Sequence, residues 1–332
     1  FIQFRWGNTL GQVAHTRVFS KEFSTTVAVA GSRYKSNSDL KILNTPFAFE
    51  NSLTELSLRA TADWHPANRL QLLTGAVVSF YDFSYLQFFN QVESINYGAT
   101  PWEVALYGDG QWTWGPATAM RAGLRLRYIS DGQRVLVEPR FSVGQPVGQF
   151  RVKVAGGIYN QYLQLIASEG FSAGDFYVPI DETLNLGRSW QAVTGAEWSI
   201  SPKYRLGLEL YYTHLQNLVL LNNTVPVDQT STASADIFKS GGEGYATGVE
   251  LFAEKRMGRL TGWIGYTLGT TRRQFDDVNG GEEFPPKYDR RHDINVVGMY
   301  RRGKWEYSLA FLYATGQAFT PASARYRVRD PA

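Results

Sequence analysis

Apolar and polar residues alternate with a period of two along most of the chain, the pattern of a β-strand with two different faces. The clearest example is the segment 121–128. Its even positions would form an apolar face, and its odd positions would carry Arg121, Arg125 and Arg127. The segments 150–154, 195–200, 204–213 and 305–313 divide in the same way. The alternation predicts an all-β chain, although a soluble antiparallel sheet with one solvated face would show it too.

The lengths of the connections favour a membrane barrel over a soluble sheet. Short turn signals are found near residues 20–21, 66–68, 115–116, 144–148, 201–203, 257–258 and 302–303. Long polar or Gly/Pro-rich stretches lie between most of them, at 36–50, 85–100, 167–187, 221–243 and 276–287, and only the connection at 131–132 is short on that side. Outer-membrane barrels alternate short and long connections. The spacing predicts about fourteen strands of about ten to seventeen residues, long enough to cross a bilayer when tilted.

Tryptophans and charged residues fit the two faces of such a barrel. Trp64, Trp112, Trp198 and Trp305 lie close to the short turns, where an aromatic girdle would meet the membrane interface. A wide lumen would hydrate inward charges that a dry core could not hold. The predicted lumen-facing residues are Arg125, Arg127, Glu138, Arg140, Arg151, Lys153, Glu197, Arg205, Glu209, Glu250 and Glu254. We predict an antiparallel transmembrane β-barrel, with residues 1–332 as one incomplete barrel domain of about 14–15 strands.

The composition argues against several other classes of protein. With 43% hydrophobic and 14% aromatic residues the chain is not disordered, yet it has no apolar run of the length that a membrane-spanning helix needs. The net charge of +3 is spread along the chain, without the basic cluster of a nucleic-acid surface. There is no cysteine, the four histidines are far apart, and no nucleophile elbow, P-loop or dinucleotide fingerprint occurs. We expect no enzyme activity, no cofactor and no metal site.

Four segments near the C-terminus carry distinctive motifs. They are Gly-Tyr-Ala-Thr-Gly-Val-Glu-Leu at 244–251, the segment 260–271, Pro-Pro-Lys-Tyr-Asp-Arg-Arg-His-Asp at 285–293 and Tyr-Ala-Thr-Gly-Gln-Ala-Phe-Thr-Pro at 313–321. Together they resemble the later barrel of TonB-dependent outer-membrane receptors, especially those of Bacteroidota and their relatives. Weaker similarities lie at 6–8, 137–140 and 157–162. In the first motif, the glycines and Glu250 are expected to face inward and the aliphatic residues outward.

This resemblance implies a 22-stranded barrel filled by an N-terminal plug, which carries a short box that binds TonB. Neither is visible here, so we expect missing strands at both ends and a plug upstream. The family imports scarce or bulky ligands, namely ferric siderophores, cobalamin, haem or glycans, with energy delivered through TonB. It implies as partners TonB, the lipid and lipopolysaccharide of the Gram-negative outer membrane, and, as in glycan importers, a surface lipoprotein. The inward Arg and Glu residues would then contact the plug, because buried charges need partners or water.

Aromatic residues in the predicted extracellular loops are candidates for ligand contact. They are Tyr81, Phe83, Tyr85, Phe88, Phe89, Tyr159, Tyr162, Phe176 and Tyr177. Such rings stack on a sugar or a siderophore catechol, but an extracellular girdle or loop packing would use them equally well. Arg290 and Arg291 at the mouth would attract an anionic ligand. Contact with lipopolysaccharide, or pairing with a nearby acidic loop, explains these two arginines as well.

Three alternatives remain open at this point. Asp276, Asp277, Glu282 and Glu283 share the acidic loop and offer oxygen ligands to Ca²⁺, but their spacing lacks an EF-hand pattern and a solvated loop is the simpler interpretation. The same barrel would also serve a passive channel, or a structural or adhesive outer-membrane protein. A soluble carbohydrate-binding β-protein is the third alternative.

Overall fold

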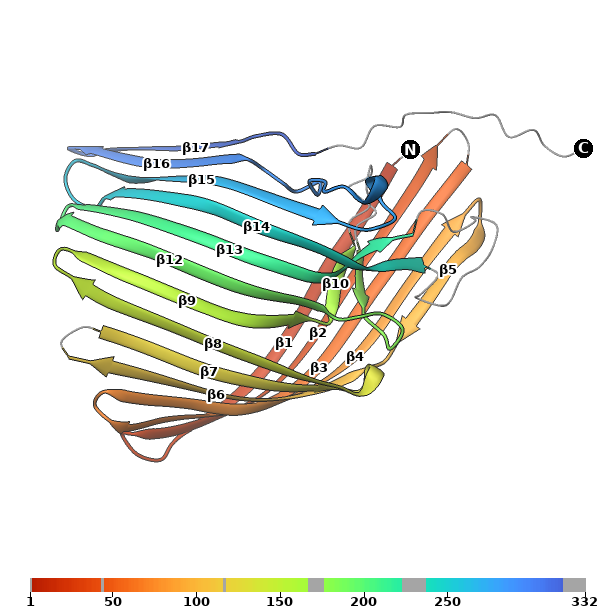
Figure 1. The fold of residues 1–332 in the computed structure, drawn as a ribbon, viewed down its shortest axis with the longest axis horizontal. Helices are drawn as coiled ribbons and strands as arrows, with labels where there is room; N and C mark the ends of the chain where they lie inside the picture. The colour runs from red at the N-terminus through yellow and green to blue at the C-terminus, as the bar shows by residue number, and fades with distance from the viewer. Residues whose placement is uncertain (1, 43–44, 116–117, 167–175, 223–236, 319–332) are drawn as a thin grey trace, which may run out of the picture.

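The computed structural model describes residues 2–42, 45–115, 118–166, 176–222 and 237–318. Nearly all of them belong to one antiparallel 15-stranded sheet, in which each strand on the main path pairs with the next one along the chain (Figure 1). The path consists of β1 (Ile2–Val18), β2 (Phe23–Ile42), β3 (Thr45–Ala67), β4 (Leu70–Phe89), β6 (Trp102–Trp114), β7 (Thr118–Ile129), β8 (Arg134–Val147), β9 (Phe150–Gln161), β12 (Gly187–Ser201), β13 (Tyr204–Leu221), β14 (Phe238–Lys255), β15 (Leu260–Gln274), β16 (His292–Arg302) and β17 (Trp305–Ala314). The predicted number of strands is confirmed.

Three further strands lie off this path. β5 (Val92–Ala99) folds back on β4, and β10 (Leu163–Ile166) pairs with β11 (Phe176–Pro179) in a separate hairpin. Among the described residues, two single turns of 3-10 helix lie in connections, η1 (Asp131–Gln133) and η3 (Asn279–Gly281). No helix in the described part of the chain is long and apolar enough to cross a membrane.

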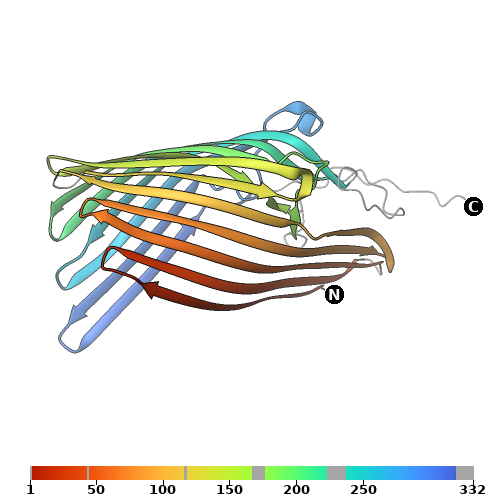
Figure 2. The same ribbon diagram turned by 90° about the horizontal axis from the view of Figure 1, so that it is seen from below.

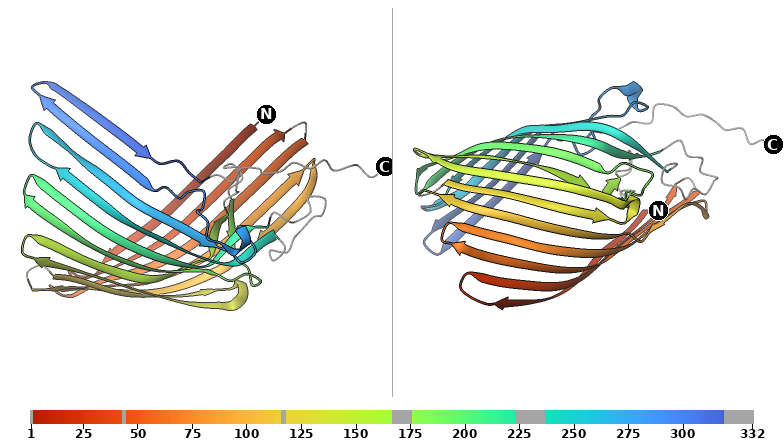
Figure 3. Two further views of the ribbon diagram at one scale, coloured as in Figure 1. Left: turned by 45° about the horizontal axis from the view of Figure 1, so that its top comes forward. Right: turned by 60° about the horizontal axis from the view of Figure 1, so that its bottom comes forward.

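The sheet is strongly curved. Seen from below in Figure 2 and at two angles in Figure 3, it curls until β1 and β17 stand on opposite sides of a hollow. Within the described residues these two strands are the edges of the sheet. The β10–β11 hairpin lies in the hollow, so the face it packs against is the concave, inner face.

Short turns gather at one end of the sheet, as predicted (Figure 1). Gly148 and Gly303 have φ values of 62° there, a left-handed conformation that tight hairpin turns need and that glycine adopts without strain. Gly144, which we had assigned to a turn, instead pairs with Ala119 inside the β7–β8 ladder. Trp64, Trp112 and Trp305 lie near these turns with 47%, 44% and 70% of their surface exposed, as a girdle requires.

The predicted loops at 36–50 and 85–100 are wrong over most of their length. β2 extends to Ile42 and β3 begins at Thr45, so most of 36–50 is strand. β4 continues to Phe89, and β5 then turns back along it. In the run 35–39 both faces are polar, so the apolar alternation that signals a strand is lost while backbone pairing continues. The predicted loop at 276–287 is confirmed. Parts of the other two predicted loops, 167–175 and 223–236, lie outside the described residues.

The two faces of the sheet differ as the alternation predicted. Residues that pair across antiparallel strands share a face, so register can be followed from strand to strand. One such outer row joins Val152, Ala196, Leu208, Leu251 and Tyr266. Leu208 and Leu251 expose 41% and 47% of their surface. A continuous exposed apolar face of this kind is what a membrane barrel turns toward lipid.

The main hydrophobic core sits in the hollow, at the end of the sheet opposite the short turns. Phe83 and Tyr85 of β4, Ile95 and Tyr97 of β5, and Ile129 of β7 contribute to it from the wall. The other members include Ile166 of β10, Val178 of β11 and Val219 of β13, together with Ile180, Leu184 and Leu186 from the segment between β11 and β12. The core therefore fixes the β10–β11 hairpin inside the wide, long-loop end of the sheet.

Candidate functional site

The candidate site consists of the charged inner face and the mouth, by which we mean the end of the sheet opposite the short turns. Register places every predicted lumen-facing residue on this one face. The directly opposed pairs among them are Arg125 with Glu138, Arg151 with Glu197, Glu209 with Glu250, and Arg205 with Glu254. Lys153 lies in the same row as Glu209 and Glu250, and Arg127 and Arg140 lie on the same face in other rows. The predicted and observed faces agree because the alternation has a period of two: an error of one residue in a strand would have placed all of its side chains on the wrong face.

Arg127 is the centre of an ionic network on the inner face of β6, β7 and β8, near the mouth. Its guanidinium donates two hydrogen bonds to Glu103, with Nε 2.9 Å from Oε1 and Nη2 2.6 Å from Oε2. Nη1 donates to Glu138 Oε1 at 3.2 Å and to the carbonyl oxygen of Asn160 at 3.1 Å. Only 12%, 6% and 8% of the Arg127, Glu103 and Glu138 side chains are exposed. A forked guanidinium between two shielded carboxylates locks three strands together.

Other inner charges pair closer to the short turns. Arg121 pairs with Asp109, and Lys153 pairs with Glu197. Arg205 Nε lies 3.1 Å from Glu254 Oε2. These pairs are more exposed than the Arg127 network, so each contributes little to stability on its own.

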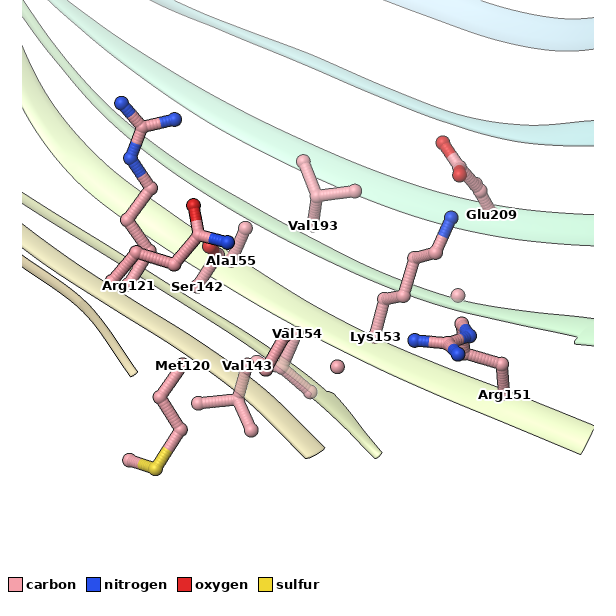
Figure 4. A pocket seen from close by; sticks show the side chains of 14 residues that line it. Met120, Arg121, Ser142, Val143, Arg151, Lys153, Val154, Ala155, Val193 and Glu209 are labelled. Carbon is pink, nitrogen blue, oxygen red and sulfur yellow. The ribbon is translucent and has the colours of Figure 1, made fainter. Parts of the chain in front are cut away.

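A second group of inner charges has no such partner. Within the described chain Arg59, Arg140, Arg151, Glu209 and Glu250 make no ion pair and no side-chain hydrogen bond. Arg151 and Glu209 line an open hollow of about 400 Å³ together with Arg121 and Lys153. Figure 4 shows Lys153 and Glu209 on the side of the sheet opposite Met120 and Val143, which point away from the hollow.

A neighbouring hollow of about 290 Å³ holds Arg59 and Arg140 beside Arg121 and Arg125, with Asp109 as its carboxylate. This part of the inner face is therefore basic. Glu209 and Glu250, in contrast, stand directly opposite each other on β13 and β14. Like charges in that position destabilise a sheet unless something else neutralises them.

Several predicted ligand residues lie in strands and not in loops. Tyr81, Phe83 and Tyr85 lie on the inner face of β4, and Phe83 and Tyr85 are 1% exposed. Tyr162 is 4% exposed. These buried side chains support the mouth by packing, because the hairpin covers them, and cannot meet a ligand directly.

The remaining predicted aromatic residues lie as follows. Tyr159 on β9 and Tyr177 on β11 expose 39% and 38% of their surface. The Tyr177 ring contacts Tyr34 of β2 edge-on, at 6.1 Å between centroids. Phe176 belongs to β11, and Phe88 and Phe89 to β4. Among the predicted residues whose side chains are described, Tyr159 and Tyr177 are therefore the exposed ones, and Tyr81 and Phe88 are half-buried.

The hairpin is anchored by contacts that the sequence did not reveal. Arg134 Nη2 donates to the carbonyl oxygens of Asp181 and Leu184, both at 2.6 Å. The Tyr97 hydroxyl donates to the carbonyl oxygen of Pro179 at 3.2 Å. These contacts join positions 47 to 82 residues apart in the chain, and no local pattern marks them.

A further anchor joins Tyr162 to the η1 turn, where its hydroxyl donates to Asp131 Oδ2 at 3.3 Å. Burial raises the pKa of Asp131 above its ordinary value, and burial also raises the pKa of Tyr162. The phenol therefore stays protonated and remains a donor at physiological pH.

Replacing Arg134 with methionine should loosen the hairpin without unfolding the sheet. Two charge-assisted hydrogen bonds are lost, which we expect to lower the free energy of local opening by about 2 kcal/mol and to speed amide exchange in 176–186 by roughly 30-fold. Hydrogen exchange with mass spectrometry on the full-length protein measures this. Arg188→Met, a change at a more exposed arginine on β12, is the control, and equal exchange in both variants would show that Arg134 is not the anchor.

Arg290 and Arg291 are exposed in the segment that precedes β16. Neither pairs with the acidic loop in the described chain. Asp277 instead pairs with Lys239, whose ammonium lowers the pKa of that carboxyl. The Tyr245 hydroxyl donates to Glu283 Oε2 at 3.4 Å. Among the described residues no three His, Cys, Asp or Glu side chains gather as metal ligands would.

No protein-family model matches the chain, and no curated protein matches it significantly. Solved structures do match. The copper transporter OprC superposes with a TM-score of 0.69 at 10% identity, over 94% of this chain and 52% of OprC. The ferric yersiniabactin uptake receptor FyuA from Yersinia pestis gives 0.69 at 12% identity, over 96% of this chain and 51% of FyuA. The FrpB iron transporter from Neisseria meningitidis gives 0.57 at 11% identity, over 93% and 59%.

The fold is that of a TonB-dependent outer-membrane receptor barrel. The chain spans about half the length of OprC and FyuA. The short turns and their tryptophans then mark the periplasmic end of the TonB-dependent barrel fold, and the hairpin marks the extracellular mouth. At 10–12% identity these relatives establish the fold and not the ligand.

Proposed function

We propose that this chain forms part of the barrel wall of a TonB-dependent active transporter in the outer membrane of a Gram-negative bacterium. It is a transporter without enzymatic activity, and it imports a scarce or bulky ligand. Ferric siderophores, cobalamin, haem and glycans are the candidate classes. The observation that carries the proposal is the contrast between the two faces: the outer face is apolar, and the inner face has five ionic groups without a partner among the described residues.

The inner face favours a barrel that holds a folded domain. Arg59, Arg140 and Arg151 on one side and Glu209 and Glu250 on the other need counter-charges or water. A plug domain with acidic and basic side chains at the matching heights would supply those counter-charges. The Arg127 network, which is already satisfied within the wall, would then serve the stability of the barrel.

The mouth is the proposed place of ligand contact. Tyr159 and Tyr177 offer exposed rings, and Arg290 and Arg291 offer exposed cations. Rings suit a sugar or a catechol, and cations suit an anionic chelate. The hydrophobic core holds the β10–β11 hairpin, and with it Tyr177, in place. This core contains Phe83, Tyr85 and Tyr162. A surface lipoprotein would be a further partner if the ligand is a glycan.

Two ligand-free measurements on the full-length protein test the transporter. Its periplasmic partner, as the purified C-terminal domain of TonB, should bind in a pull-down. In a planar bilayer with KCl the protein should show little conductance, because the plug fills the lumen. Large steady conductance steps without TonB binding would instead establish the alternative, a passive channel built on the same barrel.

A further inference from the structure

One hollow of the inner face has a large excess of positive charge. It has a volume of about 290 Å³, and its charged lining residues are four arginines, Arg59, Arg121, Arg125 and Arg140, and one carboxylate, Asp109. Arg121 already pairs with Asp109, whose side chain is 13% exposed. The other three guanidinium groups are therefore left without a carboxylate that belongs to the hollow.

These three arginines still have hydrogen-bond donors to offer. Arg59 and Arg140 are exposed, and neither makes an ion pair or a side-chain hydrogen bond within the described chain. Arg125 Nη2 lies 3.3 Å from Glu103 Oε1, but both oxygens of Glu103 already accept hydrogen bonds from Arg127, at 2.9 and 2.6 Å. Arg125 Nε is buried without a partner among the described residues. An unpaired buried donor costs free energy, which an oxyanion in the hollow would recover.

The residues around the arginines leave room for them and hold the wall in shape. Gly123 lies between Asp109 and Arg140 in one inner row. A Cβ added to Gly123 would come 2.6 Å from Asp109 Oδ2 and 3.3 Å from Arg140 Cγ, so these two side chains lean over the bare backbone of the glycine. Tyr107, which also lines the hollow, is fixed by a 2.7 Å hydrogen bond between its hydroxyl and Thr61 Oγ1.

The hollow is continuous with an exposed ring of the mouth. Gly157 of β9 pairs directly with Arg140 of β8. The Tyr159 ring lies over this glycine, because a Cβ added there would come 3.0 Å from the Tyr159 hydroxyl oxygen and 3.2 Å from Cε2. Tyr159 is one of the rings proposed for ligand contact, with 39% of its surface exposed. A ligand that moves from this ring toward the short turns therefore meets Arg140 next.

The chemistry of the hollow suits an oxyanion. A guanidinium group donates two parallel hydrogen bonds to a carboxylate or a phosphate, and it accepts none. A neutral group in the hollow would leave its excess charge unbalanced. A volume of about 290 Å³ lies at the lower end for a small-molecule pocket, so the hollow holds one arm of a bulky ligand and not the whole of it.

We infer that this hollow is a relay site, which binds one carboxylate or phosphate group of the imported ligand as the ligand passes from the mouth along the wall. The inference rests on the proposed transport function and narrows it to ligands that carry free anionic groups. Arg59 and Arg140 bind the anion, and Arg125 supplies a further donor. Arg151, Glu209 and Glu250 remain as the groups for which a plug supplies counter-charges.

Isothermal titration of the full-length protein with inorganic pyrophosphate, at about 0.15 M salt, tests the inference. The wild type should bind one pyrophosphate. Arg59→Gln and Arg140→Gln each remove one charge-assisted contact, so each should raise the Kd about tenfold. The control Arg301→Gln makes the same exchange at an exposed inner arginine of β16, outside the hollow, and should leave the Kd unchanged.

Heat-modifiable migration on a gel first establishes that each variant is a folded barrel. An absence of pyrophosphate binding in the wild type, equal binding by the wild type and both variants, or an equal loss in Arg301→Gln overturns the relay site.

The conductance of a planar bilayer with KCl separates the ligand from the plug as the source of the anionic group. It should be the same for the wild type, Arg59→Gln and Arg140→Gln. Raised steady conductance in either variant overturns the inference, because the two arginines would then hold the plug in place. None of these results contradicts the transporter itself, which fails if the wild type does not bind TonB.

Discussion

Replacing Arg127 with methionine is expected to lower the free energy of unfolding of the full-length protein by about 3–5 kcal/mol. The substitution leaves Glu103 and Glu138 shielded from solvent, with 6% and 8% of their side chains exposed. Among the described residues Glu138 then has no cation, and Glu103 keeps only Arg125, whose Nη2 lies 3.3 Å from Glu103 Oε1. Each carboxylate then bears a desolvation cost that the guanidinium offset in the wild type. Urea unfolding in detergent micelles, followed by tryptophan fluorescence, measures the change.

A matched exposed pair provides the control for Arg127. Arg301 and Glu306 also form an ion pair across neighbouring strands, with Arg301 Nε 3.0 Å from Glu306 Oε2, but their side chains are 71% and 49% exposed. Arg301→Met should therefore cost no more than about 1 kcal/mol. Equal losses in the two variants would mean that water reaches the Arg127 network in solution.

Neutralising a carboxylate in the same background separates charge from packing. In the double variant Arg127→Met with Glu138→Gln, the carboxylate that lost its cation is neutralised. We expect it to regain about 1–2 kcal/mol relative to Arg127→Met alone, because the two residues interact directly and their effects are not additive. No recovery would assign the loss to the missing arginine stem and its packing.

The Arg127 network also marks the limit of what the sequence reveals. Period-two alternation placed Arg125, Arg127 and Glu138 on the inner face, because the face of a strand residue follows from its position alone. It did not identify Glu103 as the main partner of Arg127. That contact depends on the register between β6 and β7, which turns and packing determine together.

The mouth was the least predictable part of the molecule. A long polar stretch correctly indicated that β9 and β12 are joined by a long connection. The hairpin within it, and its anchors Arg134 and Tyr97, arise from tertiary packing between distant segments. Phe83 and Tyr85 were assigned to a loop, but their strand runs beyond the expected membrane span, and there the β10–β11 hairpin covers their rings on the inner face.

The face assignments themselves lead to the second large expected effect. Leu126 of β7 is on the outer face with 41% of its surface exposed, opposite Leu106 on β6 and Val137 on β8. It lies between two aromatic levels of the outer face. Trp112, opposite Met120, stands on the side of the short turns, and the Trp102–Tyr128 ring contact at 5.3 Å stands on the side of the mouth.

Because an apolar band between two aromatic girdles faces hydrocarbon, Leu126→Arg should destabilise the folded barrel in lipid. Leu126 is the outer position next to Tyr128, so we expect about 2 kcal/mol, the lower end of the range for a charge in this band. The control places the same charge on the inner face: Thr267→Arg, directly opposite Glu250, should change stability by no more than about 0.5 kcal/mol. Unfolding in phospholipid vesicles measures both. If the loss of stability in Leu126→Arg disappears when the protein is unfolded from a water-soluble state, the outer face meets solvent and not lipid. If both variants lose the same stability, the inner face is as apolar as the outer one.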